Sequence, residues 1–84
     1  MTGNLYDVGM SPEDLRRISE VRALVATGKA REQRENRRLM LREIADAIGV
    51  TPLTVYRWEQ GTAQPRGAHA LRWADALGIQ AKAS

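Results

Sequence analysis

Cysteine is absent from this chain of 84 residues, so neither a disulfide nor a thiolate-ligated metal site can form. Histidine occurs once, as His69, and a lone imidazole makes a metal site only where several carboxylates converge on it. No apolar run approaches the ~20 residues that a membrane-spanning helix needs, and the N-terminus lacks the pattern of a signal peptide. No spacing suggests a nucleophile–base pair or a carboxylate pair. We therefore expect a cytoplasmic protein that is not an enzyme and that uses no metal or cofactor.

Phenylalanine is also absent, and aromatic residues make up only 5% of the chain. The apolar content of 43% comes mainly from Leu, Ala, Ile and Val, accompanied by many Arg and Glu residues. This bias favours helices over strands. A chain of this length has room for one small core. The composition therefore predicts an all-α protein with a single domain.

The net charge of +3 is concentrated in one stretch. Residues 29–42 hold six basic and two acidic side chains, whereas the remainder of the chain is close to balance. A basic stretch attracts polyanions and adds salt-dependent affinity for phosphate. It is equally typical of a solvated helix face that carries internal Arg–Glu pairs. The charge alone does not separate these two interpretations.

Helix start and stop signals predict about five helices along the chain, and we expect them to pack as a compact bundle. Ser11-Pro12 and Thr51-Pro52 each combine an N-cap with a proline at the first helical position. The predicted helices span residues 11–27, 29–37, 41–48, 51–60 and 67–77. The apolar stripe of the first helix consists of Leu15, Ile18, Val21 and Val25. We expect flexible tails at residues 1–10 and 80–84, on either side of one domain at 11–79.

The helices at 41–48 and 51–60 have the features of a helix-turn-helix. Ala45 is small enough to let the second helix cross the first closely, and Gly49 suits a turn with positive φ. Ile48 and Val50 place apolar side chains on both sides of that turn. In such a pair the second helix projects from the surface and can enter the major groove of a duplex.

Three residues of the second helix are candidates for contacts to DNA bases. Arg57 can bond the O6 and N7 atoms of guanine together, although a phosphate contact explains it nearly as well. Leu53 and Thr54 lie in the first turn, which reaches base edges in this motif. They can touch thymine methyl groups or bond a base, while an ordinary, partly exposed leucine is the alternative for Leu53.

Residues 41–79, LREIADAIGVTPLTVYRWEQGTAQPRGAHALRWADALGI, closely resemble the Cro/CI-type (lambda-repressor-like, XRE) helix-turn-helix family. The matching positions are Leu39, Ile44-Ala45, Gly49-Val50, Val55, Trp58-Glu59-Gln60-Gly61, Pro65 and Leu71…Ala74…Leu77-Gly78. The resemblance implies that residues 29–37 form the first helix of the family and that 11–27 is an added helix. It also implies a sequence-specific regulator of transcription that binds double-stranded DNA. Within the family, the chain most resembles a Cro-like or immunity-type phage repressor. Such a protein is expected at the nucleoid of a bacterial or phage-infected cell.

The resemblance also implies roles for single residues. It predicts an ion pair between Arg34 and Glu59 that braces the first helix against the recognition helix. Met40 and Leu41 depart from the family, which usually has a Ser or Thr cap followed by a Gln that holds a DNA phosphate. The grip on phosphate must then come from backbone amides or from nearby arginines. The predicted contacts to the DNA backbone are Arg37, Arg38, Arg42, Thr51, Tyr56, Thr62, Gln64 and Arg66.

Several alternatives remain at this point. An antitoxin-type autorepressor has the same layout, and its residues 11–27 would then bind a protein partner. A protein-interaction adaptor without DNA binding is a third interpretation. The resemblance favours a homodimer over a monomer. Trp73 fits either a core position against the added helix or a dimer interface.

Overall fold

The computed structural model describes residues 10–79, which form five α-helices and, within that range, no strand. The helices are α1 (Pro12–Ala26), α2 (Lys29–Asn36), α3 (Leu41–Ile48), α4 (Pro52–Gln60) and α5 (Gly67–Ala76). This confirms the predicted all-α bundle with an added N-terminal helix. Both ends of every helix lie within one residue of the predicted range. The expected tails, apart from Met10, lie outside the described residues.

The helix starts follow from the caps that the sequence supplies. In α1 the Ser11 hydroxyl accepts a hydrogen bond from the Asp14 N–H at 3.1 Å, and the Asp14 carboxylate accepts one from the Ser11 N–H at 3.2 Å. These two bonds satisfy amide groups that have no partner inside the helix. In α3 the Met40 side chain provides no cap, but the Glu43 carboxylate accepts the Met40 N–H at 2.9 Å. One half of a capping box therefore replaces the missing Ser or Thr.

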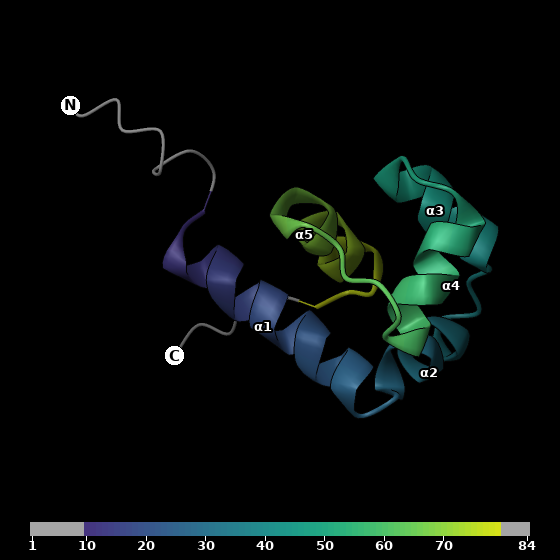
Figure 1. Ribbon diagram of the computed structural model, residues 1–84, viewed down its shortest axis with the longest axis horizontal. Helices are drawn as coiled ribbons and strands as arrows, with labels where there is room; N and C mark the ends of the chain where they lie inside the picture. The colour runs from purple at the N-terminus through teal and green to yellow at the C-terminus, as the bar shows by residue number, and fades with distance from the viewer. Residues whose placement is uncertain (1–9, 80–84) are drawn as a thin grey trace.

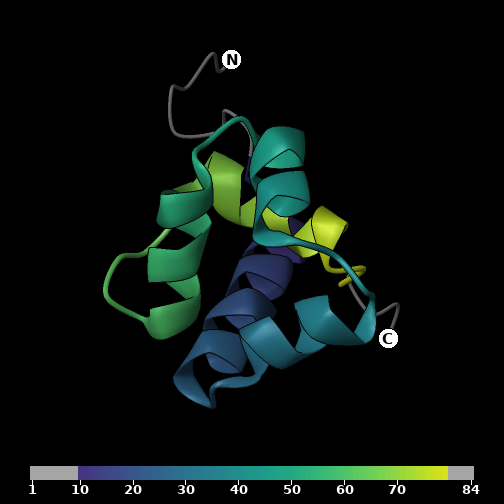
Figure 2. The ribbon, with the colours of Figure 1, turned by 90° about the vertical axis from the view of Figure 1, so that its right-hand side faces the viewer.

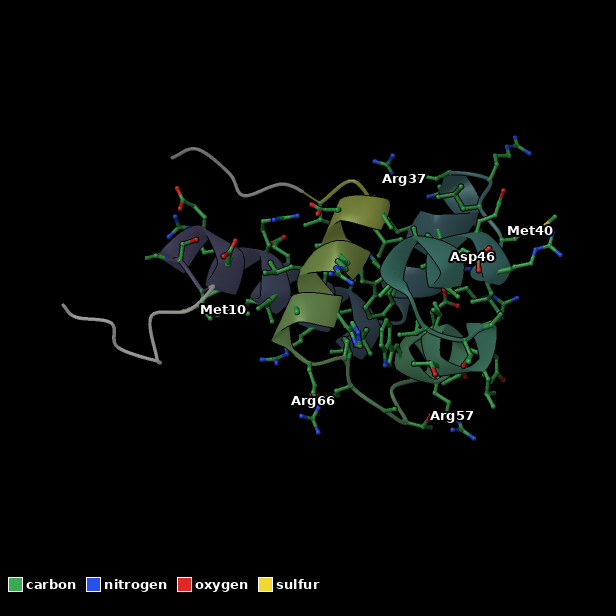
Figure 3. All side chains as sticks on the ribbon, turned by 90° about the horizontal axis from the view of Figure 1, so that it is seen from above. Met10, Arg37, Met40, Asp46, Arg57 and Arg66 are labelled. Carbon is green, nitrogen blue, oxygen red and sulfur yellow. The ribbon has the colours of Figure 1, made fainter. Side chains whose placement is uncertain are left out.

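The helices pack in an order that leaves α5 between α1 and the α3–α4 pair (Figures 1 and 3). Their shared core is made of small aliphatic side chains around two tryptophans. Trp73 is fully buried, with its ring centroid 5.2 Å from that of Trp58. Trp73 is therefore a core residue of the described structure. The other buried hydrophobic residues of the cluster are Val21, Ala30, Ile44, Ala45, Ile48, Val55, Ala74 and Leu77.

The added helix α1 covers this core from the side of α5 and α2. Ile18 and Val21 are its buried residues, and the Arg17 guanidinium pairs with Asp75 of α5. Three of the four residues predicted for the apolar stripe lie on the buried face, but Leu15 is 57% exposed and Leu24 packs against the core in its place. At ~100° per residue, Leu15 lies about 110° from the centre of the face formed by Ile18, Val21, Leu24 and Val25.

None of the helices between residues 10 and 79 has the length and apolar character needed to cross a bilayer.

Candidate nucleic-acid interface

The turn between α3 and α4 has the conformation that a glycine permits. Gly49 ends α3 at φ 94°, in the left-handed region where side chains with a Cβ are disfavoured. The N–H groups of Gly49 and Val50 both donate to the Ala45 carbonyl, at 2.8 and 3.0 Å. From α5, the Arg72 guanidinium donates to the Ile48 carbonyl at 3.2 Å and so holds the end of α3. Sequence reasoning missed Arg72, because one exposed arginine on a helix carries no signal of such a contact.

The recognition helix α4 has one buried face and one open face. Val55, Trp58 and Glu59 are buried against the other helices. On the opposite side Leu53 is 54% and Tyr56 46% exposed, and Arg57 is exposed as well. Figure 2 shows α4 and the loop after it along one edge of the molecule, and Figure 3 shows the Arg57 side chain directed away from the bundle. Leu53 and Arg57, two of the predicted base contacts, are therefore accessible together.

Thr54, the third predicted base contact, is placed differently. Its N–H donates to the Thr51 hydroxyl at 3.2 Å, and the two hydroxyl oxygens lie 2.9 Å apart. Thr54 is also half-buried. The polar atoms of Thr51 and Thr54 thus serve the start of the helix. The Thr54 hydroxyl is engaged at the start of the helix, although a hydroxyl with one such contact keeps a site for a further hydrogen bond.

The end of α4 is joined to α2 by a buried ion pair. Arg34 Nε lies 2.6 Å from Glu59 Oε2 and Arg34 Nη2 lies 3.3 Å from Oε1, so the contact is bidentate. The side chains are 10% and 1% exposed. Arg34 Nη1 also donates to the Leu39 carbonyl at 2.8 Å. This is the pair that the family resemblance implies, and it fixes α4 relative to α2 and to the turn before α3.

The basic stretch at 29–42 does not form one surface. Arg34 is buried in the ion pair with Glu59. Arg31 Nε lies 2.9 Å from Glu35 Oε2, and this hydrogen bond raises the pKa of the Arg31 guanidinium. Arg37 lies against Gly78 at the end of α5. Figure 3 shows Arg37 on the opposite side of the molecule from Arg57 and Arg66. Arg37 therefore does not join the other predicted backbone contacts.

Two arginines of this stretch remain near the start of α3. Arg38 and Arg42 are both exposed, and Arg42 Nη2 lies 3.8 Å from the Met40 sulfur. Arg38 has φ 60°, and among residues 10–79 it is the one residue other than glycine with a positive φ. A side chain in this conformation costs about 1–2 kcal/mol relative to a right-handed one. Such strain is a reason to look for a function of the residue.

The loop between α4 and α5 carries the remaining predicted backbone contacts. Thr62, Gln64 and Arg66 are exposed, and Arg66 points outward in Figure 3. The Thr62 hydroxyl donates to the Arg57 carbonyl at 3.3 Å, so it also closes the end of α4. Within residues 10–79 no three His, Cys, Asp or Glu side chains gather as a metal site. The exposed groups on this side of the molecule are suited to binding a polyanion.

In a comparison with family models, residues 31–82 match the family described as helix-turn-helix. The matched range contains α3, α4, α5 and most of α2, while α1 lies outside it. Neither the curated proteins nor the solved structures yielded a match.

Proposed function

Because the chain belongs to the Cro/CI-type helix-turn-helix family of DNA-binding transcriptional regulators, we propose that it is a sequence-specific repressor of the Cro-like or immunity type. In this proposal α4 enters the major groove of a duplex operator and occludes a promoter. The observation that carries it is the open face of α4, where Leu53, Tyr56 and Arg57 are exposed together on a helix whose other face is buried.

The proposed contacts fall into two groups. Arg57 and Leu53 meet base edges, accompanied by the Thr54 methyl group. Contacts to phosphate and sugar orient the protein without reading sequence. Arg37 is left out of this second group because it lies at the end of α5, away from α4. The proposed backbone contacts are Arg38, Arg42, Thr51, Tyr56, Thr62, Gln64 and Arg66.

Selection of bound sequences from random duplexes tests this proposal. A defined consensus, bound more weakly as salt rises, is the expected result. If Arg38, Arg42 and Arg66 each neutralise one phosphate, log Kd should change with log salt concentration by about 3 units per protomer. Selection without enrichment, or affinity that does not depend on salt, contradicts the proposal.

Two variants separate reading of bases from gripping of phosphate. Arg57→Ala should relax the preference at one base pair by about 1–3 kcal/mol. Arg38→Ala should weaken binding to all sequences alike and lower the salt slope by about one unit. Identical behaviour of the two variants would show that the assignment of these two roles is wrong.

A two-fold dimer that reads a palindrome, with half-sites about one helical turn apart, is part of the same proposal. The symmetry of the selected consensus tests it together with the stoichiometry of the complex, measured by light scattering. An asymmetric consensus bound by one protomer contradicts the dimer and leaves the DNA-binding proposal intact.

The second candidate function is an antitoxin-type autorepressor with a protein partner on α1. One observation favours it: α1 lies outside the range of the family match and exposes the large apolar side chain of Leu15. Co-purification of the chain with a protein encoded beside it in its host should then depend on Leu15 and be unaffected by Arg57→Ala. Purification without a partner, from cells that express both genes, contradicts this candidate.

A further inference from the structure

The first turn of α4 combines two apolar side chains with two threonine hydroxyls that contact each other at the cap. Pro52 has no N–H, and the Leu53 side chain contains only carbon and hydrogen. The hydroxyl of Thr54 lies 2.9 Å from that of Thr51, and the Thr54 N–H donates to the same cap. The next side chains with donors on the exposed face are Tyr56, with one hydroxyl, and Arg57, with a guanidinium one helical turn after Leu53. Pro52 and Leu53 thus present an exposed apolar surface in the part of the helix expected deepest in the groove.

Leu53 is prominent on this turn because 54% of it is exposed to solvent, although it belongs to a residue type that is usually buried. Pro52 beside it is exposed as well. The major groove of DNA displays donors and acceptors on every base pair, but only one apolar group, the C5-methyl of thymine. The same methyl group is present on 5-methylcytosine. An apolar side chain in this groove is therefore complementary to a C5-methylated pyrimidine, either thymine or 5-methylcytosine.

We propose that α4 recognises the C5-methyl group of a pyrimidine through Leu53, next to a guanine bound by Arg57. The inference rests on the proposed function and specifies its substrate: duplex DNA with thymine or 5-methylcytosine at the position that faces Leu53. Leu53 and Arg57 are four residues apart, about 6 Å along the helix axis. Since base pairs are spaced by about 3.4 Å, the methyl-bearing pyrimidine lies within about two base pairs of that guanine.

The test uses the selected consensus duplex and changes one pyrimidine at a time. Deoxyuridine in place of thymine removes only the C5-methyl group and keeps the base pair and its donors and acceptors. Burial of one methyl group corresponds to about a fourfold change in Kd. We expect a loss of this size at one or two thymines near the guanine, and no change at the others. At the same position cytosine should bind about as weakly as deoxyuridine, and 5-methylcytosine should regain about fourfold.

Two leucine variants assign the effect to one side chain. Leu53→Ala should bind the thymine and deoxyuridine duplexes equally well. Leu15→Ala is the matched control, because Leu15 is equally exposed, at 57%, but lies on α1. It should keep the full thymine preference. Since both leucines are exposed, both variants should retain the wild-type unfolding midpoint.

The inference fails if the deoxyuridine duplexes bind as tightly as the thymine duplex at every position. It also fails if Leu53→Ala keeps the wild-type preference for the methyl group. In either case a defined consensus would still support the proposed function, whereas the absence of any consensus would overturn that function itself. The two failures are therefore distinguishable in one set of titrations.

Discussion

The stability of the fold should depend strongly on Glu59, because its carboxylate is the counter-charge of a buried guanidinium. The side chains of Arg34 and Glu59 are 10% and 1% exposed and share two hydrogen bonds. Removing one partner of such a pair leaves an uncompensated buried charge, at a cost of about 3–5 kcal/mol. A chain of this size has a free energy of unfolding of about 4–13 kcal/mol. Glu59→Gln should therefore remove a large share of the stability.

Replacing both charges should cost much less than replacing one. In Arg34→Met/Glu59→Leu no buried charge remains, and apolar side chains of similar size occupy the space. The main loss is the hydrogen bond from Arg34 Nη1 to the Leu39 carbonyl, worth about 1–2 kcal/mol. The double variant should consequently be more stable than Glu59→Gln by about 2 kcal/mol.

Urea unfolding followed by circular dichroism measures these differences. The matched control is Glu35→Gln, which breaks the pair with Arg31, where the side chains are 51% and 59% exposed. Exposed pairs contribute about 0–1 kcal/mol. The reasoning is refuted if Glu59→Gln costs no more than Glu35→Gln, or if the double variant is the least stable of the three.

Two further predictions concern single residues. Arg38→Gly should raise the free energy of unfolding by about 1 kcal/mol, because glycine adopts the positive φ of this position without strain. The same variant should bind DNA more weakly, and a gain in both stability and affinity would contradict a phosphate contact. Ile18→Ala on α1 should cost about 2–5 kcal/mol because the side chain is buried, whereas Leu15→Ala should change stability by less than about 0.5 kcal/mol. Equal effects in urea unfolding would show that α1 is not packed on the core through Ile18.

The helices could be predicted from the sequence because their signals are local. A cap, a proline at the first position and a glycine at the end are adjacent to the helix that they define. The buried face of α1 is different, since it depends on where α5 and α2 lie. Leu15 continues the spacing of Ile18, Val21 and Val25, so the pattern includes it in the stripe, but the packing of α5 and α2 covers Leu24 and leaves Leu15 exposed.

The fate of the arginines shows the same limit for the site. Arg31 and Glu35 are four residues apart on one helix, so their pair is visible in the sequence. Arg34 and Glu59 are 25 residues apart, and only the family resemblance, not composition or spacing, predicted their contact. Arg37 and Gly78 meet only because α2 ends beside the last turn of α5. The number of arginines in a basic run is therefore larger than the number available to phosphate, because tertiary contacts hold some of their side chains.

The start of α4 shows why the sequence gives the candidate site only in part. The first N–H groups of a helix have no partner within it, and side chains close by must satisfy them. In a recognition helix these side chains belong to the turn that enters the groove. Here the Thr51 hydroxyl accepts the Thr54 N–H, and the two threonine hydroxyls contact each other. A sequence shows two hydroxyl groups there but not their contact with each other; in the proposed function the reading of bases therefore falls mainly to Leu53 and Arg57.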